Sequence, residues 1–121
     1  MILTVFRSRL RPDAGEAYRA WAEEIETLAR RQPGFVSVKT FAAVDGERVT
    51  LAEFETEADV SHWREQARHR EAQRLGRERF YDEYRVQVCE VFRDYSFTRP
   101  QDTRTSASAP TEKRDPAGET H

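Results

Sequence analysis

The feature that most constrains the fold is the dipeptide Asp45-Gly46, which lies between two segments rich in β-branched and aromatic residues. This dipeptide favours the positive φ angles of tight hairpin turns. Residues 35–44 and 49–55 are therefore predicted to be antiparallel strands joined by a short turn.

The residues before this hairpin predict one strand and one helix. Residues 2–10 alternate partly in polarity and are rich in strand-forming side chains. The helix that follows is predicted to begin at Asp13 as N-cap and to stop at Pro33-Gly34. Its apolar residues recur at steps of three and four along one face: Ala14, Ala17, Tyr18, Trp21, Ile25, Leu28 and Ala29.

The residues after the hairpin predict a second helix and a last strand. Thr56 followed by Asp59 resembles a capping box with a shorter acid, and Gly76 is expected to break or bend the helix. The last strand is predicted over residues 84–97, with apolar side chains on both faces. Val86, Val88 and Phe92 would lie on one face, and Cys89, Val91 and Tyr95 on the other.

This order of elements predicts an α+β, ferredoxin-like βαββαβ fold, with both helices on one face of a four-stranded antiparallel sheet. Apolar residues on both faces of the last strand predict that a second sheet, from an identical subunit, covers the other face. We therefore expect a homodimer. The domain should span residues 1–99. Residues 100–121 carry no aromatic and no aliphatic side chain larger than Ala, so they are predicted to form a disordered tail.

Charge and cysteine content narrow the classes of partner and site. Lys and Arg number 20, Asp and Glu number 22, and the net charge is −2, which would not attract nucleic acid or an anionic membrane. No apolar run approaches the roughly 18 residues that span a bilayer. Cys89 is the only cysteine, which excludes a disulfide within the chain and a two-cysteine metal site. We expect a soluble cytoplasmic protein with no metal.

Several short motifs follow one another from the hairpin onward, and their order and spacing are more informative than any one of them. They are Asp45-Gly46-Glu47-Arg48, Glu53-Phe54-Glu55, Trp63, His69, Ala72-Gln73, Gly76-Arg77 and Phe80-Tyr81. In this order and spacing the chain resembles the antibiotic biosynthesis monooxygenase superfamily over roughly residues 1 to 97.

The resemblance implies a dimeric α/β barrel with an apolar pocket between sheet and helices in each subunit. Some members oxidise aromatic hydroquinones of the polyketide type with dioxygen and no cofactor. Others cleave haem, and others have no established activity, so the fold alone does not choose among them.

Trp63 and a row of polar residues are the candidate site. The resemblance implies that Trp63 lines the pocket, although a Trp beside Val60 on a helix face is also an ordinary core residue. His62, Gln66, His69 and Gln73 would form one polar stripe if the helix continues unbroken. His69 is the proposed base, because a histidine can take a phenolic proton near neutral pH. The alternative is a solvated polar helix face.

Arg77 and Tyr81 are further candidate substrate-binding residues, located between the second helix and the last strand. A guanidinium there could stabilise a phenolate oxygen, while a surface ion pair with a neighbouring glutamate is the simpler role. Two features oppose catalysis: Asp59 stands where quinone-oxidising relatives can have asparagine, and the chain contains no asparagine.

Three functions follow. The first is a cofactor-independent monooxygenase acting on a small aromatic, quinol-like substrate, with His69 and Trp63 as catalytic residues. The second is a dimeric module that binds a small ligand without turnover. The third is a haem-binding or haem-degrading protein with a helix histidine as iron ligand.

Overall fold

The computed structural model describes residues 1–100, without the side chains of residues 67–69 and 72. The predicted tail, apart from Pro100, lies outside the described residues. Met1–Val91 form one compact unit, and Phe92 begins a second. Within the described residues, no helix is both long and apolar enough to cross a membrane.

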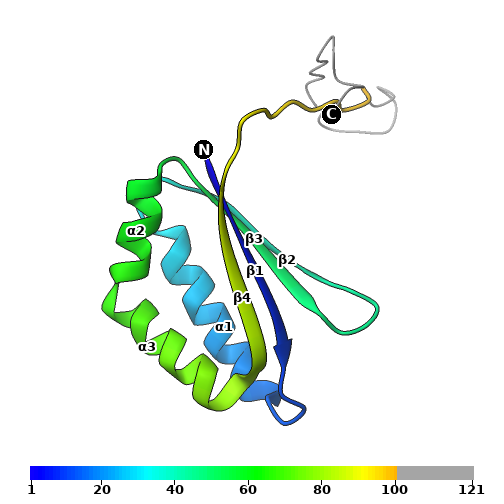
Figure 1. Cartoon of the computed structure of the whole chain (residues 1–121), viewed down its shortest axis with the longest axis vertical. Coiled ribbons are helices and arrows are strands. Elements are labelled where there is room, and N and C mark those ends of the chain that lie inside the picture. The colour runs from blue at the N-terminus through cyan, green and yellow to red at the C-terminus, as the bar shows by residue number, and fades with distance from the viewer. Residues whose placement is uncertain (101–121) are drawn as a thin grey trace. The chain divides into compact units, whose positions relative to one another are not determined.

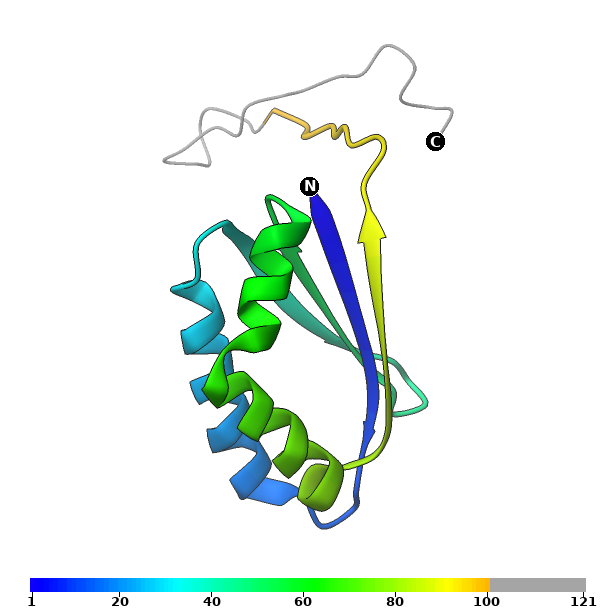
Figure 2. The same ribbon diagram turned by 60° about the vertical axis from the view of Figure 1, so that its left-hand side comes forward.

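The first unit follows the predicted order of strands and helices. The elements are β1 (Ile2–Leu10), α1 (Gly15–Arg30), β2 (Phe35–Ala42), β3 (Arg48–Phe54), α2 (Glu57–Glu65), α3 (Ala67–Leu75), the π-helical turn η1 (Gly76–Phe80) and β4 (Tyr81–Glu90). The strands form one sheet in the order β2-β3-β1-β4, and every neighbouring pair is antiparallel (Figure 1). The helices lie on one side of this sheet (Figure 2). The α+β, ferredoxin-like prediction is confirmed.

The first helix begins later than predicted. Strand β1 has the expected bounds, but α1 starts at Gly15, and the residue before it, Ala14, makes no side-chain capping bond. The carboxylate of Asp13 lies 3.6 Å from the Arg11 guanidinium instead. The prediction of Asp13 as N-cap is therefore wrong, because an ion pair with the preceding arginine takes the side chain that would have capped the helix.

The Asp45-Gly46 turn joins β2 to β3 as predicted, with a longer loop. The strands end at Ala42 and start again at Arg48, and the Gly46 N–H donates to the Ala43 carbonyl at 3.0 Å. Only Gly46, with φ +95°, has positive φ in this turn. This pattern is typical of a three-residue hairpin loop that ends in a left-handed glycine.

The second helix begins with the predicted capping box and is interrupted sooner than expected. Thr56 Oγ1 accepts a hydrogen bond from Asp59 N at 3.1 Å, and Asp59 Oδ2 accepts one from Thr56 N at 3.2 Å. Helix α2 then stops at Gln66, whose ψ of 133° is not helical, and α3 starts at Ala67. The single polar stripe required an unbroken helix, and the helix is broken at Gln66. The prediction of one continuous stripe is therefore wrong. Gly76, the predicted bend, opens η1.

The last strand differs most from its prediction. Strand β4 spans Tyr81–Glu90, whereas residues 84–97 were expected. Phe92 and Tyr95 lie beyond the strand, in the second unit, and Val86 and Val88 are 52% and 47% exposed. The expectation that both faces of this strand are buried is therefore wrong for the single chain.

Two apolar clusters lie between the sheet and the helices. At one end, Ile2, Phe54 and Val60 form a buried core, against which Phe35, Ala52 and Trp63 pack. At the other end, six rings lie within 6.2 Å of a neighbouring ring centroid: Phe6, Tyr18, Trp21, Phe80, Tyr81 and Tyr84. We call this second group the aromatic cluster. Together the two clusters hold α1, α2 and η1 on one face of the sheet.

Candidate functional site

An accessible apolar surface lies on the helix-covered face of the sheet. Phe6 points to this face, because its ring contacts Tyr81, which in turn contacts Tyr18 and Trp21 of α1. Val86 is paired with Phe6 and Val88 with Thr4, and directly paired residues in a sheet project from the same face.

Both valines remain about half exposed, although helices cover this side of the sheet. We call Phe6, Val86 and Val88 the valine surface. Solvent reaches this surface, so a flat apolar molecule could contact it. The sequence already indicated that the two valines share one strand face, but only the register places them under the helices.

Trp63 lies at the Ile2 end of the sheet. It is half-buried on α2 and packs against the core formed by Ile2, Phe54 and Val60. Part of the indole therefore belongs to the core, and the rest is accessible. Both interpretations of this residue, core packing and pocket lining, are compatible with this position.

Tyr81 lies in the aromatic cluster at the opposite end. Its backbone pairs with Leu10, and its ring contacts four other aromatic rings. Burial, with the neighbouring Tyr18 phenol adding to the effect, raises the pKa of Tyr81 far above its ordinary value of 10.0. The hydroxyl therefore stays protonated at physiological pH and cannot act as a base.

The predicted polar residues of the second helix lie on both sides of its interruption. His62 is exposed on α2, and its Nε2 is 3.1 Å from Nε2 of Gln66, the residue at the break. Gln73 is half-buried on α3. His69 belongs to α3, but its side chain is outside the described part of the structure, so its role as base stays a prediction.

Arg77 makes a side-chain hydrogen bond to an aromatic residue of β4. Its Nη1 donates to the Tyr84 hydroxyl at 3.1 Å, which joins η1 to β4. The guanidinium is exposed. Arg77 therefore helps to position Tyr84, which follows it in the same region between the second helix and the last strand.

The predicted site residues do not form a single group. Trp63 packs at the Ile2 end of β1, whereas Tyr81 pairs with Leu10 at the other. A strand rises about 3.3 Å per residue, so these two backbone positions on β1 are roughly 26 Å apart. The valine surface lies on the sheet between these two positions.

The opposite face of the sheet, here called the open face, combines apolar and charged residues. Leu3 and Val5 of β1 pair with Glu53 and Leu51 of β3 on this face. Next to them, the Arg7 guanidinium donates to both carboxylate oxygens of Glu47, at 2.9 and 3.1 Å.

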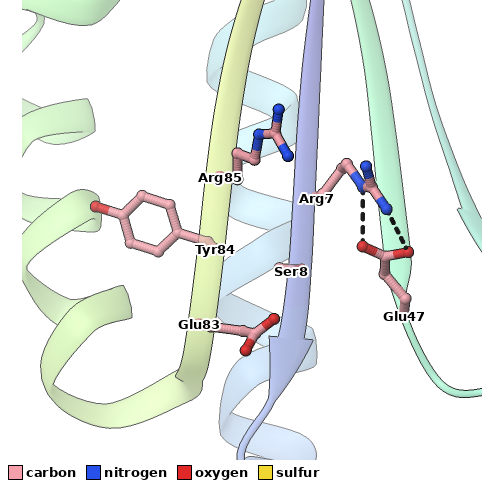
Figure 3. A pocket seen from close by; sticks show the side chains of 6 residues that line it. All are labelled: Arg7, Ser8, Glu47, Glu83, Tyr84 and Arg85. Carbon is pink, nitrogen blue, oxygen red and sulfur yellow. Dashed lines mark hydrogen bonds and ion pairs between the residues drawn. The ribbon is translucent and has the colours of Figure 1, made fainter.

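A hollow of about 180 Å³ lies beside this ion pair, lined by Arg7, Ser8, Glu47, Glu83, Tyr84 and Arg85. In Figure 3, Arg7 points toward Glu47, and Tyr84 points the other way, toward the helices. The hollow is lined by charges, with Arg7 and Glu47 already paired, and it lacks the apolar walls typical of a pocket for an aromatic substrate.

Comparison with known proteins decides the family. The model of the family described as antibiotic biosynthesis monooxygenase matches residues 1–75. The chain belongs to this family. The uncharacterised protein YqjZ of Bacillus subtilis is 31% identical to this chain over 93 residues, which span 77% of this chain and 82% of the relative.

Solved structures agree with the antibiotic biosynthesis monooxygenase fold. Rv0793 from Mycobacterium tuberculosis has a TM-score of 0.70 at 22% identity, covering 78% of this chain and 98% of that one. SnoaB, a cofactor-independent oxygenase from Streptomyces nogalater, has a TM-score of 0.67 at 15% identity, covering 77% and 94%. At these identities the likeness establishes the shared fold, and activity has to be argued from the site.

Proposed function

We propose that this protein is a cytoplasmic, cofactor-independent monooxygenase that oxidises a small aromatic, quinol-like substrate of the polyketide type with dioxygen. The observation that carries the proposal is the valine surface, an accessible apolar area beneath the helices in a chain of the antibiotic biosynthesis monooxygenase family. The shared fold with SnoaB, a cofactor-independent oxygenase, supports the absence of a cofactor.

The proposed chemistry needs no external reductant. When a hydroquinone becomes a hydroxyquinone, one oxygen atom of dioxygen forms a new bond to a ring carbon, and the other leaves as water. The substrate supplies all the electrons. The step that the protein must assist is removal of a phenolic proton, because the phenolate is the electron-rich form that reacts with dioxygen. We propose that His69 accepts this proton, since histidine titrates near neutral pH.

The other predicted site residues would bind and orient the ring. Trp63 would stack on the flat substrate over the valine surface and exclude water. His62, Gln66 and Gln73 would bind polar substituents on the α2 and α3 side. Arg77 would stabilise a developing phenolate charge, and Tyr81, protonated because its pKa is raised by burial, would serve only as a hydrogen-bond donor.

We also propose that the protein is a homodimer that forms the dimeric α/β barrel through the open face. Leu3, Val5 and Leu51 give this face an apolar centre that no element of the first unit covers. An identical sheet with two-fold symmetry would bury it.

The test is oxygen consumption by metal-free protein with a panel of aromatic hydroquinones. Wild type should consume oxygen above the rate without protein. Trp63→Ala should lose most of this activity and Trp63→Phe should keep a larger share, because the phenyl ring still stacks. His69→Ala should lose activity and also the dependence on pH near neutrality. Arg31→Gln, an exposed position after α1 and outside the open face, is the control and should match wild type. No oxygen uptake by folded wild type would reject the proposal.

A second candidate function is ligand binding without turnover, and Asp59 favours it. Its Oδ2 accepts hydrogen bonds from both the backbone N–H and the hydroxyl of Thr56, at 3.2 and 2.9 Å. This carboxylate therefore caps α2 and is not free to contact a substrate. Saturable binding of a hydroquinone without oxygen uptake would support this function. A Soret shift of added hemin that His69→Ala abolishes would instead support haem binding.

A further inference from the structure

Tyr84 lies at one end of the valine surface. Its backbone pairs with Ser8, and Val86 and Val88 follow on the same face of β4 at steps of two. The Tyr84 ring is 5.4 Å from the Phe6 ring between centroids, and Figure 3 shows the phenol pointing toward the helices. Tyr84 therefore continues this apolar area toward η1 and gives it a polar end.

Tyr84 is the most accessible phenol of the aromatic cluster. It is 36% exposed, whereas Tyr18 and Tyr81 are half-buried among other rings. The Nε of Arg48, whose guanidinium lies over the Tyr18 ring, has no hydrogen-bond partner among the described residues, but it is buried and out of reach of a ligand. The Tyr84 hydroxyl is therefore the polar group of this cluster that a molecule on the valine surface can contact.

The Tyr84 hydroxyl has a proton available for a hydrogen bond. Arg77 Nη1 lies 3.1 Å from it, and a guanidinium carries no acceptor, so the hydroxyl oxygen accepts in this bond. In the part of the chain that the structure describes, no group accepts from the hydroxyl in return. A hydrogen bond received from a cation polarises the O–H group and strengthens it as a donor. This end of the valine surface therefore suits an acceptor oxygen.

The neighbouring carboxylates are directed elsewhere. Glu83 precedes Tyr84 directly, so its side chain projects from the open face, where it lies 3.9 Å from the Arg9 guanidinium. The Glu78 carboxylate of η1 is paired with Arg74 at 3.1 Å. A substrate hydroxyl placed beside Tyr84 would have to find an acceptor for its own proton, whereas a carbonyl oxygen only accepts.

We propose that Tyr84 is a specificity-determining residue whose hydroxyl donates a hydrogen bond to a carbonyl oxygen of the aromatic substrate. This inference rests on the proposed function, because it places the substrate ring on the valine surface. Arg77 holds the phenol in position through its hydrogen bond. The preferred substrate is a hydroquinone that carries a ketone on its ring, in preference to one with only hydroxyl and alkyl groups.

The experiment compares acetylhydroquinone with ethylhydroquinone, which are similar in size and differ in one carbonyl oxygen. Binding is measured by calorimetric titration of the full chain under nitrogen, so that no oxidation occurs. Wild type should bind the acetyl compound about fivefold more tightly, which corresponds to one net hydrogen bond. In Tyr84→Phe this preference should disappear, with the affinity for the ethyl compound unchanged. Tyr18→Phe removes a half-buried phenol hydroxyl from the same cluster and should keep the preference.

A spectroscopic measurement locates the hydrogen bond. A carbonyl that accepts a hydrogen bond has a weaker C=O bond, so its infrared stretching frequency falls. The isotope-labelled carbonyl of acetylhydroquinone should therefore absorb at a lower frequency when bound to wild type than when bound to Tyr84→Phe. Binding to Tyr18→Phe should give the wild-type frequency.

Equal affinities for the two compounds in folded wild type, or no binding of either, would overturn the inference. So would a preference that survives Tyr84→Phe or vanishes in Tyr18→Phe. A carbonyl preference without oxygen uptake would support this role of Tyr84 and reject the oxidation. Oxygen uptake that is indifferent to the carbonyl and to Tyr84→Phe would reject the role of Tyr84 alone. The wild-type comparison decides even if a variant fails to fold.

Discussion

At the scale of single residues, Gly34 is constrained by its neighbours as well as by its own backbone. It has φ +78°, and a Cβ placed on it would overlap the Asp59 carboxyl group. Gly46 has φ +95° and nothing within 4 Å of the same position. The two glycines therefore separate the conformational cost of a side chain from the steric cost.

Gly34→Ala should destabilise the protein more than Gly46→Ala. The change at position 46 carries only the cost of the left-handed conformation, about 1–2 kcal/mol. The change at position 34 carries that cost and also displaces the carboxylate that caps α2, which adds about 1 kcal/mol. Urea unfolding of both variants checks this order. Equal losses would mean that Asp59 moves aside freely.

The buried phenol of Tyr81 should make stability depend on pH in alkaline solution. The pKa of Tyr81 is raised in the folded state, while the unfolded phenol titrates near 10.0. The folded state therefore holds its proton where the unfolded state has lost it, so the free energy of unfolding falls as the pH rises above about 10. The free energy of unfolding should fall less steeply with pH in Tyr81→Phe than in wild type. Unfolding measured from about pH 8 to about pH 11, a range that spans the titration of an ordinary phenol, checks this. The same slope in both proteins would place the phenol in solvent.

At the scale of elements, ion pairs tie the β2–β3 hairpin to β1. The Glu47 backbone N–H, followed by Arg9, lowers the pKa of Asp45 below its ordinary value of 3.8, and hydrogen bonding from Arg7 lowers the pKa of Glu47 below 4.5. Both carboxylates are therefore better stabilised in the folded state. That stability is present above their unfolded pKa values and is lost as the pH falls through and below them.

Arg7→Gln should weaken the loss of stability in acid. Without the guanidinium, the pKa of Glu47 returns toward its ordinary value, so the free energy of unfolding should fall less steeply below pH 4.5 than in wild type. Arg31→Gln removes the same charge from an exposed position outside the open face and leaves both acids in place, so it should follow wild type. Denaturant unfolding across the acid range measures both slopes. A wild-type slope in Arg7→Gln would assign the acid sensitivity to other carboxylates.

At the scale of the whole molecule, the open face should set the oligomeric state. Leu51 is near the centre of this face, between Val5 of β1 and Lys39 of β2. Leu51→Lys should convert a dimer to a monomer, because an unpaired charge buried between two sheets costs several kcal/mol. Val86→Lys, on the helix-covered face, should leave the dimer intact. Light scattering after size exclusion distinguishes the two masses, and a dimeric Leu51→Lys protein would exclude this face as the interface.

The predicted fold agrees well with the structure because its signals are local. The bounds of β1, the capping box of Thr56 and Asp59, and the turn at Gly46 each depend on residues a few positions apart. The end of β4 was misjudged for the opposite reason. Alternating apolar residues continue past Glu90, but a strand also needs a partner, and β1 begins at Ile2, opposite Glu90.

Less of the candidate site could be predicted. The polar stripe assumed one continuous helix, and Gln66 interrupts it. Tyr81 was predicted as a substrate-binding residue, and only the structure places its ring in the aromatic cluster. Arg48 was noticed only as part of a motif, since nothing in its immediate sequence indicates that Glu47 binds Arg7 on the other face and leaves the Arg48 Nε without a hydrogen-bond partner among the described residues.

By itself, the sequence determined the order of strands and helices, the start of α2 and the position of the hairpin glycine, because periodicity, capping and φ preference act within a few residues of the chain. Only the tertiary structure decided which side chains meet. It placed Trp63 and Tyr81 at opposite ends of the sheet, exposed Val86 and Val88 beneath the helices, and left the Arg48 Nε without a hydrogen-bond partner among the described residues. Those outcomes depend on strand register and on pairings between residues 40 or more positions apart, which local patterns do not encode.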